Sequence, residues 1–412
     1  MVSAGLKDSI DAGKKEYLWA KNRMPLLSKI VKKYSKNQVL NDFSLGMCLH
    51  ITKETAVLAK SLAEAGAKIS LCAANPLSSK KDVINYLLYI DSSINIHTNK
   101  QGDIGSFYNN MDKVLDAKPQ IVTDDGAELH KKAVFRKQSL VGGTEETTSG
   151  VNRLRALSND SLLLYPVIAV NESIMKQMLD NRYGTGQSTL EGIINTTGII
   201  LASKRIVVCG YGWVGKGVAR CARGMGAKVT ITEVEPLKAL QAFFDGYEVS
   251  DLKDLLSGND IFITCTGQIN VIGREHFNDL KDGAILCNAG HFDVEIDVKY
   301  LDRIDPHHYE PKPNVTCYYI SEGIRKKRIY VITKGRVVNL VGAEGNSSEV
   351  MDISFSNQFL AIVYLSKTAG RLSNKVYKPP QKLDSKLARL SLTAYGIRID
   401  KLTSDQINYL KK

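Results

Sequence analysis

Residues 207–217 read VVCGYGWVGKG and contain the glycine pattern GxGxxG. The apolar run at 205–209 predicts a strand before this loop, and the residues after it predict a helix. In such a unit, Gly210 allows a tight turn, Gly212 lets the backbone approach a pyrophosphate, and Gly215 lets the helix pack closely on the strand. The helix N-terminus also offers N–H donors to a phosphate. The stretch therefore predicts the first unit of a dinucleotide-binding α/β fold.

The acid at the end of the next predicted strand indicates which dinucleotide is bound. Residues 228–232 form that strand, and Glu233 follows it, 18 residues after Gly215. Near this spacing a carboxylate binds the adenosine ribose hydroxyls and repels a 2′-phosphate, which favours NAD over NADP. Lys238 weakens the preference slightly, because it could partner either Glu233 or a phosphate. The cofactor contacts expected here are Gly210, Gly212, Trp213, Val214, Gly215, Lys216, Gly217 and Glu233.

Short apolar stretches alternate with helical periods in two series along the chain. The first series runs from about residue 43 to 135, and the second runs from 204 to about 340. Alternation of this kind predicts parallel sheets with crossover helices. Residues 351–367 return to helical periodicity, and the prolines at 379–380 break the chain before a final helix.

Composition excludes several classes of protein. The 412 residues, 43% hydrophobic and 24% charged, are typical of a globular chain of two or three domains. No apolar run approaches the roughly 18 residues of a membrane span, and residues 1–15 lack the apolar centre of a secretory signal. The seven cysteines are scattered without CxxC spacing, which predicts reduced thiols in the cytoplasm. We therefore expect no membrane partner.

The net charge of +12 makes nucleic acid a partner to consider, but the distribution of charge argues against it. Lysines and arginines are spread along the chain and lack interleaved aromatic residues. Their densest run, at 325–328, follows Gly323 and predicts a solvated hairpin turn. The seven histidines show no HExxH or other ligand spacing. We expect neither a nucleic acid partner nor a metal site.

Eight stretches match the motifs of one known family. They are CLHITKETAVL (48–58), TDDGAEL (123–129), GGTEETTSGV (142–151), AVNESIMKQMLDNRYGTGQS (169–188), the glycine loop, NAGHFDVEID (288–297), MDISFSNQ (351–358) and KLTSDQINYL (401–410). Through them the chain resembles the S-adenosylhomocysteine hydrolase family, in order and over nearly its whole length. The DNRYG and GHFDVEID motifs are specific to that family.

The resemblance implies an α/β fold of two doubly wound parallel-sheet domains, with an NAD-binding Rossmann domain inserted into a substrate domain. It accounts for the late position of the glycine loop. The expected segments are a substrate-binding and catalytic domain at 1–180, the NAD domain at 181–344, a return to the substrate domain at 345–385 and a short C-terminal segment at 386–412.

The resemblance also implies reversible hydrolysis of S-adenosyl-L-homocysteine to adenosine and L-homocysteine with tightly bound NAD. The ribose 3′-OH is oxidised by the cofactor, which acidifies the C4′ hydrogen. Homocysteine is then eliminated, water adds, and the ketone is reduced again, so that the cofactor is regenerated in each turnover. The implied protein is a homotetramer or dimer of the cytoplasm that acts in the methyl cycle of one-carbon metabolism.

Lys176 and Asp180 are spaced to share one face of a helix, and pattern alone is compatible with an exposed ion pair. Followed by Asn181, they match the ribose-oxidising residues of the family. The resemblance implies that the Lys176 amine, with a pKa lowered near the cofactor, accepts the 3′-OH proton. Glu146 would hold the ribose hydroxyls.

Three further residues match proton-transfer and gating groups of the family. Asp125 follows the predicted strand at 119–123, at the edge where open α/β sheets bind ligands, although a helix cap is the simpler role for it. In the family pattern Asp125 removes the C4′ proton, assisted by His50, and the two relay a proton to the departing sulfur. His291, with Phe292, would gate the substrate channel as the domains close.

Other contacts follow from the same resemblance. Glu54 matches the carboxylate that accepts a hydrogen bond from the adenine amine. The expected catalytic residues are His50, Asp125, Glu146, Lys176, Asp180, Asn181 and His291. The expected substrate contacts are Thr52, Glu54, Asp125, Glu146, Lys176, Asp180 and Asn346. Beyond the glycine loop, the expected cofactor contacts are Thr147, Thr148, Ser149, Asn181, Ala289, Gly290, His291, Asn339 and Asn346.

Several positions depart from the family pattern. Thr185, Trp213 and Ser149 replace a cysteine, an aspartate and a threonine without removing an acid or a base. Lys80 stands where the family has a glutamine that helps to bind a monovalent cation, and its ammonium would repel such an ion. We therefore expect activity that does not depend on K⁺ versus Na⁺.

Two departures bear on substrate and assembly. Residues 346–348 read Asn-Ser-Ser in place of His-Pro-Ser beside the adenine site, so S-inosylhomocysteine is an alternative substrate. Glu54 favours adenine, because a carboxylate facing the O6 of hypoxanthine would be repelled. The chain ends at Lys412 without the tail by which many relatives reach a neighbouring subunit's NAD. We therefore expect weaker cofactor retention and a less secure tetramer.

Two other functions fit parts of the sequence. A D-2-hydroxyacid dehydrogenase has a related NAD domain, but it needs a substrate-binding arginine and an acid–histidine pair in the cofactor half, for which we find no match. A non-catalytic NAD-binding regulator would be marked by loss of Lys176, Asp180, His50 or Asp125, and all four are present. S-adenosylhomocysteine hydrolysis is the function that we predict.

Overall fold

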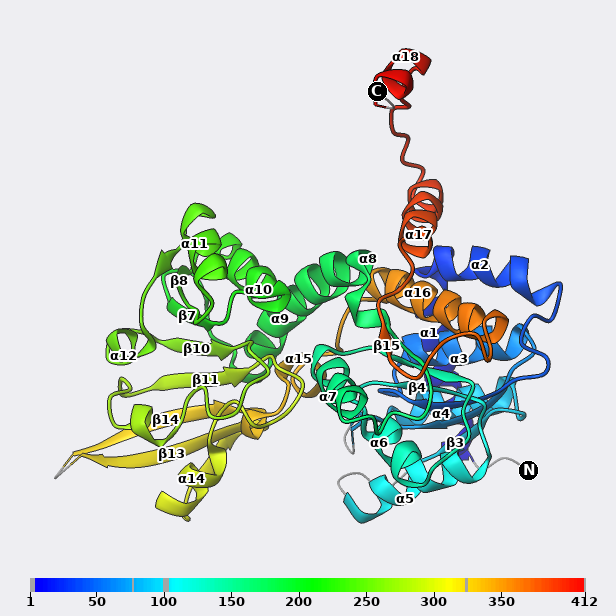
Figure 1. Cartoon of the computed structure of the whole chain (residues 1–412). Coiled ribbons are helices and arrows are strands. Elements are labelled where there is room, and N and C mark those ends of the chain that lie inside the picture. The colour runs from blue at the N-terminus through cyan, green and yellow to red at the C-terminus, as the bar shows by residue number, and fades with distance from the viewer. Residues whose placement is uncertain (1–3, 76–77, 99–103, 323–324, 411–412) are drawn as a thin grey trace.

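The chain forms two α/β parts that lie side by side, each built on one sheet with helices on both faces (Figure 1). A computed structural model describes residues 4–75, 78–98, 104–322 and 325–410. Lys411 and Lys412, where the predicted C-terminal segment ends, lie outside these ranges. The predicted α/β class is confirmed.

The first sheet has seven strands in the order β15-β6-β5-β4-β1-β2-β3, and every described pairing in it is parallel. Its strands are β1 (Ser44–Cys48), β2 (Lys68–Cys72), β3 (Asn95–His97), β4 (Ile121–Asp124), β5 (Gly142–Glu145), β6 (Val167–Ala169) and β15 (Val376–Tyr377). The helices of this part are α1 (Ala4–Asn22), α2 (Pro25–Ser35), α3 (Lys53–Glu64), α4 (Lys81–Ile90), α5 (Ile104–Asp116), α6 (Glu128–Phe135), α7 (Thr148–Asn159), α16 (Ser348–Lys367) and α17 (Gln381–Ala394).

The second sheet has eight strands in the order β12-β13-β14-β11-β10-β7-β8-β9. They are β7 (Arg205–Cys209), β8 (Lys228–Thr232), β9 (Glu248–Val249), β10 (Ile261–Thr264), β11 (Ala284–Asn288), β12 (Tyr309–Lys312), β13 (Val315–Glu322) and β14 (Arg325–Ile332). Its helices are α9 (Thr185–Thr197), α10 (Trp213–Gly224), α11 (Pro236–Phe244), α12 (Leu252–Leu255), α13 (Arg274–Phe277), α14 (Val298–Ile304) and α15 (Val338–Val341).

One edge of the second sheet differs from the predicted parallel arrangement. Strand β13 pairs antiparallel with both β12 and β14. The basic run at 325–328, predicted as a hairpin turn, is the start of β14, because pairing with β13 already begins at Glu322 and Arg325. Gly323, in the predicted turn, lies outside the described residues. Long charged side chains suit such an edge hairpin, and Arg328 pairs with Asp282 at 2.8 Å.

The order of strands reverses once in each sheet. In the first sheet the chain passes from β1 to β2 and β3 on one side, and later to β4, β5 and β6 on the other. In the second sheet β7 holds the same position between β10 and β8. Open α/β sheets bind ligands at the carboxyl ends of the strands flanking such a reversal. These two places are therefore the expected binding crevices.

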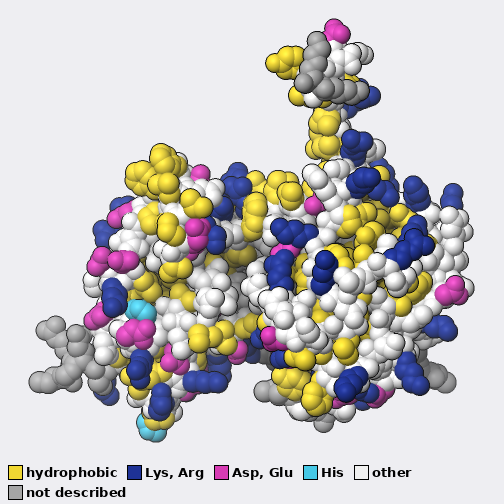
Figure 2. Space-filling model, in the orientation of Figure 1, with side chains coloured by type: hydrophobic (Ala, Val, Ile, Leu, Met, Phe, Trp, Pro, Cys, Tyr) yellow, Lys and Arg dark blue, Asp and Glu magenta, His cyan; other side chains and the backbone are white. Residues whose placement is uncertain are grey.

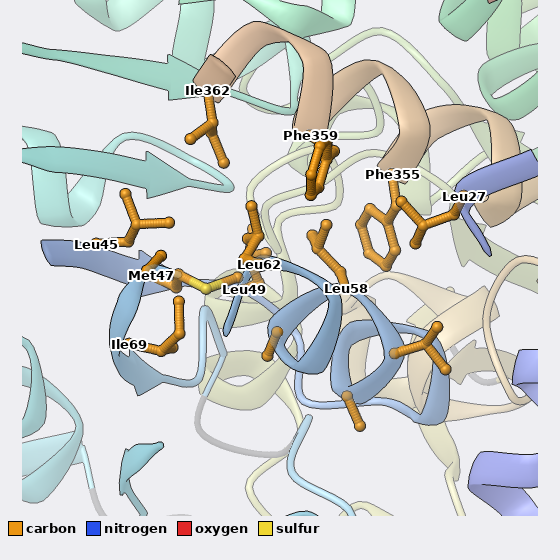
Figure 3. Packing of buried hydrophobic residues seen from close by; sticks show 14 of the residues in the cluster. Leu27, Leu45, Met47, Leu49, Leu58, Leu62, Ile69, Phe355, Phe359 and Ile362 are labelled. Atoms are coloured by element: carbon orange, nitrogen blue, oxygen red, sulfur yellow. The ribbon is translucent and has the colours of Figure 1, made fainter. Parts of the chain in front are cut away.

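The core of the first part is built around α16, which returns from the second sheet. Phe355 and Phe359 of this helix pack with Leu58 and Leu62 of α3 and with Met47 of β1 (Figure 3). Each of these side chains is buried, and burying one of this size contributes about 1.5–3 kcal/mol. Helix α16 is thereby held in the first part of the molecule. Strand β15, which follows it, pairs with β6 of the first sheet.

The surface carries charges of both signs. Figure 2 shows Lys and Arg side chains over both parts of this face, with Asp and Glu among them. Among the residues described, none of the helices combines the length and apolar character needed to cross a membrane. All seven cysteines are free thiols. Helix α18 (Ser404–Tyr409) stands away from the rest of the chain beyond α17 (Figure 1).

Candidate active site

A cavity of about 1000 Å³ lies between the two sheets and is lined from both. Its walls include residues that directly follow β1, β4 and β5 of the first sheet and β7, β8, β10 and β11 of the second. It therefore joins the two crevices at the strand reversals. The predicted site residues that line it are His50, Thr52, Glu54, Asp125, Glu146, Thr147, Thr148, Ser149, Lys176, Asp180, Asn181, Gly210, Gly212, Trp213, Val214, Lys216, Glu233, Ala289, Gly290, His291, Asn339 and Asn346.

The glycine loop has the geometry of a pyrophosphate cradle. Gly210 has a φ of +98°, and a Cβ at Gly215 would lie 1.9 Å from the Gly210 carbonyl oxygen. A Cβ at Gly212 would meet nothing within 4 Å, which leaves the backbone there open to a ligand. Gly217 packs elsewhere, since its Cβ would lie 1.8 Å from the Arg182 carbonyl oxygen. Gly215 and Gly217, predicted as cofactor contacts, lie outside the cavity lining and serve close packing of α10.

Glu233 follows β8 and lies beside this loop. Its carboxylate accepts hydrogen bonds from the backbone N–H of Tyr211 at 2.7 Å and of Val234 at 2.8 Å. Lys238 also lines the cavity. Lys216 donates to Gln241 at 2.6 Å. The residues beside this loop therefore fit an adenosine ribose with free hydroxyls, as in NAD.

A second cluster surrounds Lys176 at the end of the short helix α8 (Ile174–Lys176). The Lys176 Nζ donates to Asn181 Oδ1 at 2.7 Å and lies 3.3 Å from Asp180 Oδ2 and 3.8 Å from Glu146 Oε1. The next segment, η2 (Gln177–Gly184), is a π-helical turn, a form often found at functional sites. This turn carries Asp180 and Asn181 to the same amine.

The pKa of Lys176 is shifted in two opposing directions by the protein groups around it. Burial lowers this pKa, but the carboxylates of Asp180, Glu146 and Asp125 outweigh burial, so the net shift is upward. The predicted lowering refers to an amine beside the bound cofactor, and it stays a prediction. Burial also raises the pKa of Glu146 well above its usual range. The cluster holds a proton among an amine and several carboxylates.

Asp180 is anchored by residues that return from the second sheet. Asn346 Nδ2 donates to Asp180 Oδ1 at 2.6 Å, and Ser354 Oγ donates to Asp180 Oδ2 at 2.5 Å. Asn346 Oδ1 also accepts from Ser188 Oγ at 2.9 Å. Asn346 was predicted as a substrate and cofactor contact, and the structure places it beside Asp180. Ser354 was missed, because a buried serine within an apolar helix gives no sequence signal.

Asp125 lies between two histidines that come from different sheets. Its Oδ2 is 3.5 Å from His50 Nε2, and its Oδ1 is 3.8 Å from His291 Nδ1. Burial lowers the pKa of His50 to about 4 against the opposing charge of Asp125, and burial also lowers the pKa of His291. Both rings are therefore neutral near pH 7. One ring nitrogen of each histidine and one carboxylate oxygen of Asp125 all lie within 4.8 Å of one another. Spacing along the sequence could not reveal this proximity.

Glu54 lies at the start of α3, whose first turn is capped by Thr52, which accepts from the Thr55 N–H at 3.4 Å. Glu54 is buried, and its Oε1 accepts from Ser348 Oγ at 2.6 Å. Ser348 opens α16, so this contact joins two segments nearly 300 residues apart. Glu54 lines the cavity together with Asn346, while Ser348 lies behind Glu54, outside the cavity lining.

Several buried polar atoms of the cavity wall point to a bound ligand. Within the described part of the chain, the atoms without a hydrogen-bond partner include both carboxylate oxygens of Glu146, His50 Nδ1, Ser149 Oγ and Asn339 Oδ1. A buried polar atom without a partner is costly, and a ligand commonly supplies the missing one. Since all four residues line the cavity beside the glycine loop, the site fits a polar dinucleotide and a second polar molecule.

The fold and this cavity define a two-sheet dinucleotide-binding enzyme whose acid and base groups lie mainly outside the dinucleotide-binding sheet. Residues 6–139 match the family described as S-adenosyl-L-homocysteine hydrolase, and residues 181–345 match its NAD binding domain. The chain belongs to the S-adenosyl-L-homocysteine hydrolase family, and its cofactor is NAD.

Similar proteins named adenosylhomocysteinase support this assignment. That of Sulfurisphaera tokodaii is 46% identical and covers 98% of this chain and 96% of the relative. That of Aquifex aeolicus is 45% identical over 97% of this chain and 96% of the relative, and that of Thermotoga maritima is 41% identical over 98% and 99%. The likeness extends over nearly the whole length of each protein.

Proposed function

We propose that this chain catalyses the reversible hydrolysis of S-adenosyl-L-homocysteine to adenosine and L-homocysteine. One observation carries the proposal: a single cavity brings together the glycine loop, the Lys176–Asp180 pair and the group formed by His50, Asp125 and His291. Oxidation at one ribose carbon and proton removal at the next require two such sets of groups beside one cofactor. A simple dehydrogenase would need only the first set.

The first set of groups serves the ribose 3′-OH. NAD, when bound, takes up the hydride from C3′ and returns it at the end of the turnover. Lys176 accepts the hydroxyl proton while Asn181 and Asp180 orient the amine. Glu146, with unpaired buried oxygens among the described residues, binds the ribose hydroxyls. The positive charge of NAD⁺ in the same cavity would lower the pKa of Lys176, against the three carboxylates that raise it.

The second set serves C4′ and the departing sulfur. Asp125 removes the acidified C4′ proton, and neutral His50, 3.5 Å away, takes the proton over. A histidine with a pKa of about 4 releases a proton readily, so His50 is suited to protonate the departing homocysteine sulfur. His291, from the other sheet, completes the site when the two parts are together. Water then adds at C5′ by the reverse of these transfers.

Glu54 favours adenine as the base. Its buried carboxylate already accepts from Ser348 and keeps acceptor capacity for an exocyclic amine. The O6 of hypoxanthine is an acceptor and would leave that carboxylate without a donor. S-inosylhomocysteine is therefore the weaker candidate substrate.

The experiment that tests the function uses protein loaded with NAD⁺. Adenosine alone should produce bound NADH, visible in absorbance, and S-adenosyl-L-homocysteine should release a thiol without net consumption of free NAD⁺. Wild-type protein that never forms bound NADH from adenosine would rule the proposal out. Net NAD⁺ consumption with a 2-hydroxy acid would instead support a D-2-hydroxyacid dehydrogenase.

We further propose that the chain acts in the cytoplasm as a tetramer or dimer. Its seven free thiols suit a reducing compartment. Helix α18 and the segment before it expose Ile399, Leu402, Tyr409 and Leu410, which are apolar surfaces suited to a second copy of the chain. Native mass measurement tests the assembly, and a monomer at micromolar concentration would contradict it.

A further inference from the structure

Two pairs of adjacent acids end the neighbouring strands β4 and β5. They are Asp124-Asp125 and Glu145-Glu146, and the strand register places Asp124 directly beside Glu145. The outer acids, Asp125 and Glu146, line the cavity. The inner acids are fully buried below it and do not touch its space. The family motifs assign the outer acids but leave the inner acids without a role.

Glu145 holds the backbone on both sides of the site. Its Oε1 accepts from the N–H of Gly126 at 2.8 Å and of Thr147 at 3.0 Å, and its Oε2 accepts from the N–H of Ala127 at 3.0 Å. Gly126 and Ala127 both have left-handed backbones, with φ of +115° and +63°. For an alanine this conformation is unfavourable, so the carboxylate stabilises a strained turn directly after Asp125.

Asp124 fixes the same turn from the other end. Its Oδ1 accepts from the Asp125 N–H and its Oδ2 from the His130 N–H, each at 2.9 Å. Its carbonyl oxygen accepts from the Glu146 N–H at 3.0 Å. Asp124 thus accepts from the N–H groups of both outer acids, Asp125 and Glu146. Glu145 accepts from the N–H groups of the residues that directly follow them, Gly126 and Thr147.

The Glu145 side chain packs against a glycine of the next helix, α7. A Cβ at Gly150 of α7 would lie 2.3 Å from the Glu145 carboxyl carbon. On the other side of the turn, a Cβ at Gly126 would lie 2.8 Å from His291 Nε2. A small shift of the turn would therefore alter the position of Asp125 relative to the His291 ring.

We propose that Glu145, acting with Asp124, is a positioning residue that sets Asp125 for proton transfer at C4′. This inference rests on the proposed hydrolase function. A carboxylate is required because it presents acceptors to three N–H groups at once, whereas an amide has one accepting oxygen and one donating nitrogen. In Glu145→Gln, the oxygen can keep Gly126 and Thr147, but the amide nitrogen then faces the Ala127 N–H, donor against donor. The turn after Asp125 is loosened while the Thr147 side is kept.

The test separates two partial reactions of NAD⁺-loaded protein with adenosine. Formation of bound NADH reports oxidation of the ribose. Exchange of the C4′ hydrogen of the bound nucleoside with solvent deuterium reports proton removal by Asp125. In Glu145→Gln we expect NADH formation within about threefold of wild type and C4′ exchange slower by about 10²-fold, as for a misplaced catalytic group. Glu172→Gln is the matched control, because Glu172 pairs with the Arg155 side chain at 2.7 Å and should change neither signal.

Gly150→Ala provides a second variant that keeps the carboxylate. Alanine favours the helix, but its Cβ displaces the Glu145 carboxylate from all three N–H groups, so we expect NADH formation to fall as well, but by less than C4′ exchange. If Glu145→Gln does not fold, Gly150→Ala alone tests the positioning role of Glu145. Unchanged C4′ exchange in the folded variants would overturn the inference, and so would equal loss of both signals, which indicates a general structural role. Absence of bound NADH in wild type would instead overturn the proposed function.

Discussion

Lys176 Nζ lies 3.3 Å from Asp180 Oδ2, and the two side chains are only 7% and 5% exposed. An exposed i,i+4 pair would contribute little, whereas a buried pair costs desolvation and is kept where its charges are needed. Asp180 is also held by Asn346 and Ser354, which come from beyond the second sheet. The amine is therefore positioned by segments that precede and follow the second sheet in the sequence.

Replacing the amine should stop ribose oxidation. In Lys176→Met the side chain keeps its bulk but cannot accept the 3′-OH proton. We expect bound NADH formation from adenosine to fall by about 10²–10⁴-fold, the range for a general base. Absorbance of the NAD⁺-loaded protein measures it. Undiminished NADH formation in this variant would remove Lys176 from the role.

Removing His50 should affect only the later step. His50 contacts Asp125 but none of the Lys176 cluster in the contacts described. In His50→Ala we expect bound NADH to appear as in wild type, while thiol release from S-adenosyl-L-homocysteine slows by about 10²-fold or more. Thiol release read beside absorbance tests both. Equal loss of both signals would contradict the assignment of His50 to elimination.

The sequence predicted well those parts of the structure in which a residue type or a pattern of residue types permits only one local backbone geometry. The glycine loop required Gly210 at positive φ, and the alternation of apolar strands with helices predicted both sheets. Strand β5 was missed because residues 142–145 read GGTE, which has no apolar alternation although each residue is buried. The hairpin at the edge of the second sheet was predicted, but its basic run was placed in the turn although it pairs with β13 as the start of β14.

The inner acids show a different limit. In the runs TDDG and TEET, the sequence cannot say which acid faces the cavity, because the alternation of sides depends on where each strand ends. The family motif named Asp125 and Glu146, and only the register showed Asp124 and Glu145 beneath them. Residue roles and the four-segment division stay predictions. Pairing of β15 with β6 supports the return of the chain to the first part.

The buried His130 predicts a specific pH dependence of stability. Its ring bonds Tyr165 Oη at 3.0 Å and the Thr144 carbonyl oxygen at 3.1 Å, and burial lowers its pKa from 6.5 to about 4. Because the folded pKa lies below the unfolded one, the unfolded chain binds more protons between these values. The stabilisation by neutral His130 is therefore complete above about pH 6.5 and is lost as the pH falls toward about 4.

Comparison of wild type with His130→Gln isolates this group from the nearby acids. The variant should be less stable near neutral pH, and its deficit in unfolding free energy should shrink by up to about 1.4 kcal/mol for each pH unit below about 6.5. Urea unfolding of both proteins at several pH values measures the deficit. A deficit that stays constant down to about pH 5 would show that His130 titrates normally in the folded chain.

Base preference should depend on Glu54. Wild type should cleave S-adenosylhomocysteine faster than S-inosylhomocysteine, because in the proposed function the buried Glu54 carboxylate accepts from the adenine amine. Glu54→Gln places a donor toward O6 in one amide orientation, so the ratio of kcat/KM for the two thioethers should fall by about tenfold or more. Ser348→Ala, which removes the donor to Glu54 at 2.6 Å, is the companion variant and should leave adenine preferred. Faster turnover of the inosine thioether by wild type would reverse the substrate assignment.

Lys80 should make the enzyme indifferent to the monovalent cation. Lys80 is exposed at the start of α4, and its charge acts with that of Lys53 to lower the pKa of Glu344, which lines the cavity. Lys53 pairs with Glu344 at 2.5 Å, and the charge of Lys80 further reduces the negative potential that would attract a cation. Activity of wild type should therefore be equal in K⁺ and Na⁺.

In Lys80→Gln a neutral amide replaces the ammonium near Glu344. Stimulation by K⁺ of about twofold or more should then appear, because the negative charge of Glu344 raises the local cation concentration. Lys81→Gln, one residue along, is the control and should leave the enzyme indifferent. Clear K⁺ stimulation of wild type would show that the ammonium of Lys80 does not take the place of the ion.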